Sequence, residues 1–262
     1  QYLTSLLAQR IHPEAPEKAD LKVVYTPLNG AGNRYVREAL KRSGVTSVSV
    51  VPEQENPDPD FTTCPYPNPE IREALSLAIQ KAKQEDAELV LATDPDSDRV
   101  GIAVKDDGGE FRLFSGNEVG ALLLSYIAQG RMQQGTMPHR PVAIKTIVTT
   151  RLADAIAQKY GIELLSVLTG FKFIGEQIAR LEEQGEENRY LFGFEESYGY
   201  LAGTYVRDKD AVAASTLICE MAAFYKLQGK SLIQAIEGLY QEYGIYLNAQ
   251  QSFQFEGEQG ME

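Results

Sequence analysis

The sequence predicts an α/β protein built from two tandem domains, and three observations support this prediction. Short apolar strands alternate with amphipathic helices, which is the order of a parallel α/β layer. The alternation restarts after a glycine-containing turn at residues 105–110, which places a domain boundary near 110–116. The 262 residues are enough for two domains of ordinary size.

The expected strands of the first half are short apolar runs, and its expected helices repeat apolar residues at a spacing of three and four. One helix stops at Gly44, and the prolines of residues 52–70 exclude regular structure there. In chain order the elements are a helix within 1–20, a strand at 21–25, a helix at 33–44, a strand at 45–51, a helix starting near Pro69, strands at 88–93 and 100–104, and an edge strand at 111–114.

The helix that follows the proline-rich stretch has a specific start signal. Asn68 is a favourable N-cap, Pro69 suits the first helical position, and Glu70 stands in the first turn. We therefore expect the helix to begin at these residues. Its buried face is expected to consist of Ile71, Leu75, Ala78, Ile79 and Ala82.

The second half repeats the alternation of helix and strand and ends in two long helices. Gly161 ends one of its helices, and a glycine turn at 169–170 opens the next. The expected elements are a helix at 117–129, a strand at 142–150, a helix at 151–161, a strand at 162–168, a helix within 169–185, a strand at 189–197, and helices at 210–229 and 231–244.

Composition excludes several classes of function. A net charge of −12 argues against general nucleic-acid binding, which needs basic surface. No apolar run is long enough to span a bilayer, so no membrane role is expected. The two cysteines, Cys64 and Cys219, lie far apart, which favours a reducing, cytoplasmic setting over a disulfide framework. The start of the chain has no signal-peptide pattern. It also lacks a starting Met, so we expect the chain to be part of a longer protein.

Three aspartates follow the buried strand at 88–93. Asp94, Asp96 and Asp98 alternate along LVLATDPDSDRVGIAV, and Arg99 comes directly after them. Ligands bind at the carboxyl ends of strands in open α/β sheets, and clustered carboxylates suit Mg²⁺ or Ca²⁺. An EF-hand loop needs Gly at position 6 and Glu at position 12. Counted from Asp94, these positions hold Arg99 and Lys105, so the segment is not an EF-hand. We predict that this aspartate loop (residues 94–98) binds a metal beside a phosphate-binding arginine; an acidic surface turn is the alternative.

A second acidic segment ends the strand at 189–197. Glu195 and Ser197 alternate, so their side chains point the same way if the strand continues, and the pair suits adjacent sugar hydroxyls. A solvated turn at the strand end is the alternative. Further along, Arg207 and Lys209 of VRDKD are cations that suit a phosphate, or a charge run at a helix start.

Several segments together resemble the α-D-phosphohexomutase superfamily of phosphoglucomutases and phosphomannomutases. DPDSDR resembles its metal loop, and GFEESYG resembles its sugar-binding loop. TGFKFIG, in which Thr169 and Gly170 form a turn that opens a helix and offers amides to phosphate, matches as well. YTPLNGAGNRYV and PYPNPE also match, and all segments come in family order. The resemblance covers nearly the whole chain.

The resemblance implies two tandem three-layer α/β domains with mixed, mostly parallel sheets. Residues 1–113 would be the second family domain, with the metal loop. Residues 114–262 would be the third, with the sugar-binding loop and the start of a linker at FQFEGEQGME. Domains I and IV would be missing, because neither a T-A-S-H-N-P-like phosphoserine motif nor an R-x-S-G-T-E-P phosphate loop is found. No catalytic residue is therefore expected within this chain.

For function, the resemblance implies part of a phosphoglucomutase that interconverts glucose 1-phosphate and glucose 6-phosphate through a phosphoserine and a bisphosphate intermediate. Mg²⁺ would be the cofactor, held by the three aspartates, and glucose 1,6-bisphosphate would activate the parent enzyme. The isolated chain is expected to be inactive. The residues expected to bind the hexose phosphate are Arg99, Glu195, Ser197, Arg207, Lys209, Thr169 and Gly170.

Three alternatives fit the same residues. Within the family, mannose and pentose phosphates are alternative substrates. Asp-x-Asp loops also serve metal-dependent phosphatases, although there the first aspartate follows the first strand of the chain. The third alternative is a module that binds metal and sugar phosphate without turning the sugar phosphate over.

Overall fold

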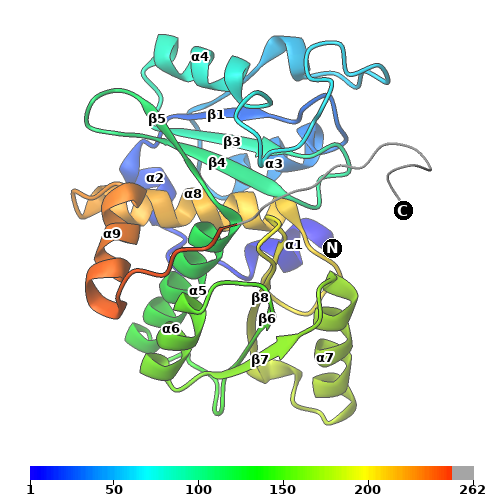
Figure 1. The fold of residues 1–262 in the computed structure, drawn as a ribbon, viewed down its shortest axis with the longest axis vertical. Helices are drawn as coiled ribbons and strands as arrows, with labels where there is room; N and C mark the ends of the chain where they lie inside the picture. The colour runs from blue at the N-terminus through cyan, green and yellow to red at the C-terminus, as the bar shows by residue number, and fades with distance from the viewer. Residues whose placement is uncertain (250–262) are drawn as a thin grey trace, which may run out of the picture.

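Two mixed sheets lie on either side of a layer of helices, and each sheet comes from one half of the chain (Figure 1). The computed structural model describes residues 1–249. Three parallel strands form one side of each sheet, and antiparallel strands extend the other side, which confirms the α/β class with mixed sheets. The first sheet, in the order β2-β1-β3-β4-β5, contains β1 (Val23–Thr26), β2 (Val48–Val50), β3 (Leu89–Thr93), β4 (Val100–Lys105) and β5 (Phe111–Phe114). The second, in the order β7-β6-β8-β9, contains β6 (Val142–Thr146), β7 (Glu163–Val167), β8 (Tyr190–Phe194) and β9 (Tyr200–Leu201).

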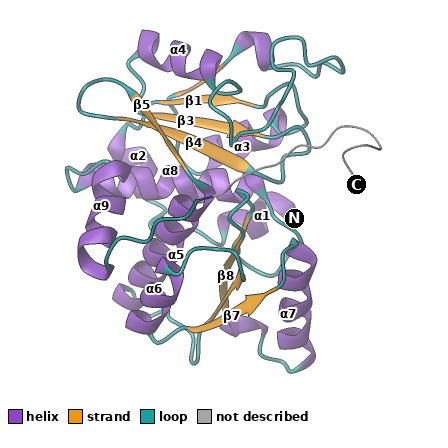
Figure 2. Ribbon diagram, viewed as in Figure 1, coloured by secondary structure: helices purple, strands orange, loops and turns teal. Residues whose placement is uncertain are grey.

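Helices cover both faces of each sheet (Figure 2). Helix α4 (Ser76–Glu85) covers the outer face of the first sheet, and α7 (Phe171–Glu183) covers the outer face of the second. The other helices are α1 (Tyr2–Leu7), α2 (Ala15–Ala19), α3 (Asn33–Arg42), α5 (Gly116–Gln133), α6 (Leu152–Tyr160), α8 (Ala211–Leu227) and α9 (Leu232–Tyr243), with short 3₁₀ turns at Pro52–Gln54 and Glu187–Arg189. Within the described range, no helix combines the length and the apolar character that crossing a bilayer needs.

Alternate residues of each strand enter different hydrophobic cores, as the two-residue period of a strand requires. On β3, Leu89 and Leu91 face the central helices, whereas Val90 faces α4. On β6, Ala143 faces the central helices and Ile144 faces α7. The protein therefore has an outer core on each side and a central core that contains residues of both halves.

Helix α8 comes from the second half but packs under the first sheet. It contacts α2, α3 and β4 of the first half, as well as α5 and β9 of the second. Its residues from Ala211 to Ala223 are buried, which fits a helix that is apolar on nearly all sides. Buried Glu220 accepts hydrogen bonds at 2.7 Å from the N–H of Ile11 and from the hydroxyl of Tyr126. The two halves therefore share a core, which the sequence did not indicate.

The helix start expected at Asn68 is wrong. Helix α4 begins at Ser76, and the preceding residues form turns. The side-chain oxygen of Asn68 accepts a hydrogen bond from the N–H of Glu70 at 3.0 Å, as in an Asx turn. Pro69 packs so closely on β4 that a Cβ on Gly101 would lie 2.4 Å from its carbonyl oxygen. This contact holds the segment against the sheet, so the capping signal marks a turn rather than a helix.

Two strands end earlier than expected, and both ends matter for the site. β6 ends at Thr146 instead of 150, and β8 ends at Phe194 instead of 197. After β8, the N–H of Glu195 donates to the carbonyl of Gly199 at 2.9 Å and closes a tight turn. The other expected elements are present with shifted ends, and the expected helix within 1–20 is split into α1 and α2. The linker segment at FQFEGEQGME lies outside the described residues.

Candidate metal and sugar-phosphate site

The three predicted aspartates lie together in the turn between β3 and β4. One carboxylate oxygen from each of Asp94, Asp96 and Asp98 lies within 4.8 Å of the others. Asp94 is buried, Asp96 is exposed, and Asp98 is half-buried. Ser97 adopts a left-handed conformation with φ 59°, and its N–H donates to the carbonyl of Asp94 at 3.0 Å. This tight turn is what brings alternating carboxylates to one point.

Asp94 organises the aspartate loop from inside. Its Oδ1 accepts hydrogen bonds from the N–H groups of Asp98 at 3.0 Å and Arg99 at 2.9 Å. Its Oδ2 accepts a hydrogen bond from Nε of Arg99 at 2.8 Å. Burial raises the pKa of Asp94 to about 6, although the hydrogen bonds from Arg99 act to lower it. The sequence predicted Arg99 beside the aspartates, and the structure places its guanidinium against Asp94.

The oxygen atoms of the loop fit a divalent cation such as Mg²⁺. Oδ1 of Asp98 is buried and has no hydrogen-bond partner among the described residues, and the same holds for Oγ of Ser97. Such buried oxygen atoms carry a desolvation cost that a cation offsets. Hard oxygen ligands at one point are the donor set that Mg²⁺ and Ca²⁺ prefer.

The aspartate loop contacts the segment that follows β8, which we call the sugar loop (residues 195–199). Arg99 and Gly199 pair in an isolated antiparallel bridge. Nζ of Lys209 lies 2.7 Å from Oδ2 of Asp98, so the cation predicted from VRDKD reaches the aspartate loop. Gly199 leaves space for this lysine, because a Cβ there would lie 2.6 Å from Cδ of Lys209.

The TGFK turn also meets the sugar loop. Glu195 is buried, and its Oε1 accepts a hydrogen bond from the N–H of Gly170 at 3.0 Å. Burial raises the pKa of Glu195, although Gly170 and the nearby Lys209 act to lower it. Thr169 is exposed beside this turn, and Ser197 is half-buried. A carboxylate acceptor, a hydroxyl and the turn that opens α7 at one place can bind a polar ligand such as a sugar phosphate.

Arg207 does not join this cluster. Its guanidinium pairs with Glu182 of α7 and donates to the carbonyl of Thr204. Among the described residues, neither polar partner belongs to the aspartate loop or to the sugar loop. A role for Arg207 in substrate binding therefore needs a rearrangement of its side chain.

Two acidic residues near the site were not predicted from the sequence. Oε2 of Glu196 accepts hydrogen bonds from the hydroxyls of Thr146 at 2.8 Å and Thr149 at 3.2 Å. Oε1 of Glu70 lies 3.6 Å from Nη1 of Arg99. Glu70 belongs to the PYPNPE segment, whose resemblance to the family was the available signal.

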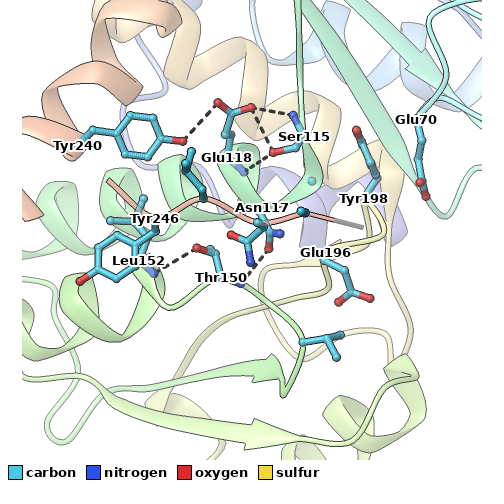
Figure 3. Close-up of a pocket in the computed structure, with 15 residues that line it drawn as sticks. Glu70, Ser115, Asn117, Glu118, Thr150, Leu152, Glu196, Tyr198, Tyr240 and Tyr246 are labelled. Carbon is cyan, nitrogen blue, oxygen red and sulfur yellow. Dashed lines mark hydrogen bonds between the residues drawn. The ribbon is translucent and has the colours of Figure 1, made fainter. Parts of the chain in front are cut away.

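A pocket of about 750 Å³ lies beside the sugar loop, between the two halves (Figure 3). Glu70 and Glu196 border it, and its wall includes Asn117, whose side chain accepts a hydrogen bond from the N–H of Thr150 at 2.9 Å. Glu195 and the three aspartates are not part of its lining. The pocket is therefore adjacent to the predicted site rather than identical with it.

The chain matches known proteins over nearly its whole described length. Residues 1–109 match the family model of phosphoglucomutase/phosphomannomutase α/β/α domain II, and residues 115–243 match that of domain III. The phosphoglucomutase of Staphylococcus haemolyticus is 40% identical over 245 residues, which are 94% of this chain and 43% of that protein. The phosphoglucomutase of Staphylococcus aureus strain MRSA252 is 40% identical over 243 residues, again 43% of its length. The chain thus spans less than half of the length of the curated relatives that it matches.

Solved structures show the same fold. A protein from Thermus thermophilus, provisionally named a phosphomannomutase, superposes with a TM-score of 0.73 at 26% identity and covers 93% of this chain and 50% of that one. Parafusin, a phosphoglucomutase from Paramecium in its open form, superposes with a TM-score of 0.67 at 20% identity and covers 94% and 41%. The chain belongs to the phosphoglucomutase/phosphomannomutase family of the α-D-phosphohexomutase superfamily and matches its domains II and III.

Proposed function

We propose that this chain is the central part of a phosphoglucomutase that interconverts glucose 1-phosphate and glucose 6-phosphate through a phosphoserine and a bisphosphate intermediate. The observation that carries the proposal is the meeting of the aspartate loop, Lys209 and the sugar loop at one place. The curated relatives at 40% identity are named phosphoglucomutases, which favours glucose. In this proposal residues 1–113 and 114–262 are domains II and III, and domains I and IV belong to the parent protein.

Phosphoryl transfer depends mainly on positioning and on stabilisation of charge. Asp94, Asp96 and Asp98 would hold Mg²⁺, which when bound supplies positive charge to phosphoryl oxygens as a Lewis acid. Arg99 and Lys209 bring two further cations to the same place. The nucleophilic serine would come from domain I, so this chain supplies charge and position but no nucleophile.

The sugar loop would orient the hexose. Oε1 of Glu195 is occupied by the N–H of Gly170, which fixes the side chain and leaves Oε2 for a sugar hydroxyl. Ser197 would bind the neighbouring hydroxyl. Thr169 and Gly170, at the start of α7, would contact substrate phosphate through the turn that opens the helix.

A comparison of substrates tests the proposal. The full-length parent and this chain are assayed with glucose 1-phosphate, mannose 1-phosphate and ribose 1-phosphate, with Mg²⁺ and a trace of the matching bisphosphate as activator. We expect the parent to prefer glucose 1-phosphate and this chain to be inactive. Turnover by this chain would contradict the expectation that the nucleophilic serine lies in another domain. Release of phosphate without isomerisation would favour a phosphatase. Absence of isomerisation by the parent would overturn the proposal.

A further inference from the structure

Asp210, between Lys209 and helix α8, makes more hydrogen bonds than a helix cap needs. Its Oδ1 accepts from the N–H groups of Val212 and Ala213, both at 3.0 Å, which is ordinary N-capping. A serine or threonine hydroxyl would serve this purpose equally well. The carboxylate of Asp210 has a second oxygen, and the residue is only 6% exposed.

Two tyrosines donate to the remaining acceptor positions of Asp210. The hydroxyl of Tyr2, on α1, lies 2.8 Å from Oδ1 and 2.9 Å from Oδ2. The hydroxyl of Tyr205 donates to Oδ2 at 2.9 Å, and the rings of Tyr2 and Tyr205 pack edge to face with centroids 6.1 Å apart. Burial, followed by the charge of Asp210, raises the pKa of both tyrosines, so both hydroxyls stay protonated and act as donors.

The backbone around Asp210 is bonded to both halves of the site. Its own N–H donates to the carbonyl of Tyr200 at 3.0 Å, just after the sugar loop. The N–H of Ala211 donates to the carbonyl of Ser97 at 3.2 Å, inside the aspartate loop. Lys209 is the preceding residue, and its Nζ lies 2.7 Å from Asp98. A shift of Asp210 therefore moves Lys209 relative to the aspartate loop.

We propose that Asp210, fixed by Tyr2 and Tyr205, is a positioning residue that keeps Lys209 paired with Asp98. It acts through Lys209, which in turn offsets part of the negative charge of the aspartate loop. Helix α1 thereby becomes part of the site, although Tyr2 is 208 residues away from Asp210 in the sequence. The consequence for catalysis rests on the proposed function, whereas the pairing itself is a property of this chain and is tested without catalysis.

Titration of this chain with Mg²⁺ alone tests the pairing. The double variant Tyr2→Phe/Tyr205→Phe keeps every charge and both rings but removes the two hydroxyl donors. We expect it to bind Mg²⁺ roughly two- to fivefold more tightly, because a displaced Lys209 no longer competes for Asp98. A loop that is merely loosened would bind Mg²⁺ more weakly, so the direction of the change separates positioning from general destabilisation. Tyr35→Phe is the matched control, since Tyr35 packs on Tyr2 and is 52% exposed.

A double-mutant cycle shows whether the effect passes through Lys209. On a Lys209→Met background, the two Tyr→Phe changes are expected to leave Mg²⁺ affinity unchanged. Equal effects on both backgrounds would overturn the inference, as would unchanged or weaker Mg²⁺ binding by the double variant alone. If circular dichroism shows that the double variant is unfolded, Tyr205→Phe serves in its place, with a smaller shift in the same direction.

Activity of the full-length parent extends the test. With glucose 1-phosphate, the double tyrosine variant is expected to lose roughly 10- to 100-fold in kcat/KM, the range for a misplaced catalytic-site group, and Tyr35→Phe to lose none. Normal activity of the double variant would overturn the catalytic part of the inference. An inactive wild-type parent would overturn the proposed function instead, and the Mg²⁺ cycle on this chain would still decide the pairing.

Discussion

The two acidic loops meet at one place, yet their negative charges have different partners. In the aspartate loop, two of the three carboxylates pair with cations, Arg99 and Lys209. In the sugar loop, Glu195 and Glu196 accept hydrogen bonds from a backbone N–H and from two threonine hydroxyls. Within the described residues, no cation lies within ion-pair distance of either glutamate, whereas the aspartate loop contacts two.

This difference suits the two kinds of ligand that we propose. A loop of three carboxylates repels itself, so attached cations stabilise it until a metal takes over part of that role. Carboxylates held by neutral donors keep acceptor positions for neutral hydroxyls, which a sugar offers. In this proposal, a metal takes over part of the role of the two cations at the aspartate loop, and sugar hydroxyls bind to the remaining acceptor positions of the sugar loop.

The largest effect is expected from Gly30→Ala, which would distort the aspartate loop and not the sugar loop. A Cβ on Gly30 would lie 2.4 Å from Cα of Pro95, inside that loop, and the N–H of Ala31 donates to the carbonyl of Pro95 at 2.8 Å. Because backbone must move, we expect Mg²⁺ affinity to fall by about tenfold or more and stability to fall by about 1–3 kcal/mol. Calorimetric Mg²⁺ titration and thermal unfolding measure both. Gly238→Ala, a site with nothing within 4 Å, is the control, and unchanged Mg²⁺ affinity in Gly30→Ala would contradict the role of this contact.

Asp96→Asn is expected to separate metal binding from stability. Asp96 is exposed, so its replacement changes the free energy of unfolding by no more than about 0.5 kcal/mol. Mg²⁺ affinity is expected to drop by roughly tenfold, because one of three converging carboxylates is lost. Asp107→Asn, an exposed acid in the turn after β4, controls for net charge. Equal Mg²⁺ binding by the two variants would argue against the metal site.

Glu196→Ala is expected to lower stability and to leave Mg²⁺ affinity unchanged, which is the reverse of Asp96→Asn. It removes the acceptor of the hydroxyls of Thr146 and Thr149, which should cost about 1 kcal/mol of unfolding free energy. Mg²⁺ affinity should stay the same if the two loops work separately. Chemical denaturation and Mg²⁺ titration give the two readouts, and exposed Glu237→Ala on α9 is the control. A parallel loss of Mg²⁺ binding would show that the loops are coupled through their contact.

The smallest effect concerns pH and Glu195. Its pKa is raised by burial, so the folded state binds this proton more tightly than the unfolded state does. Stability from this group therefore falls as pH rises through the raised pKa. Glu195→Gln removes that loss, so the variant should have a higher Tm than the wild type at about pH 8 and an equal Tm at about pH 4. Glu237→Gln is the control, and a lower Tm for Glu195→Gln at the higher pH would refute the sign.

The aspartate loop was predictable because the residues that define it are close together in the sequence. Asp94, Asp96 and Asp98 lie within one turn after a strand whose apolar sequence marks it, and the resemblance to the family supports the same residues. The orientation of the Glu196 side chain was not predictable. Side chains alternate between the two faces of a sheet only while the strand continues, and β8 ends at Phe194.

Non-local partners account for the rest of what the sequence did not indicate. Asp210 stands at the start of the helix expected at 210–229, and nothing in the sequence links it to Tyr2, which is 208 residues away. Helix α8 is apolar on nearly all sides, so its periodicity does not say which sheet it covers. Asn68 carried a good capping signal, but packing of Pro69 against β4 determined its conformation.

The shared position of α8 has a consequence for the order of folding during synthesis. The strands of the first sheet are complete at Phe114, but the helix that closes its central face begins only at Ala211. Until the ribosome has made that helix, side chains such as Leu89 and Leu91 lack part of their final cover. The nascent first half is therefore expected to be a client of chaperones, and its final docking to be slow, because the contacts that complete it are distant in sequence.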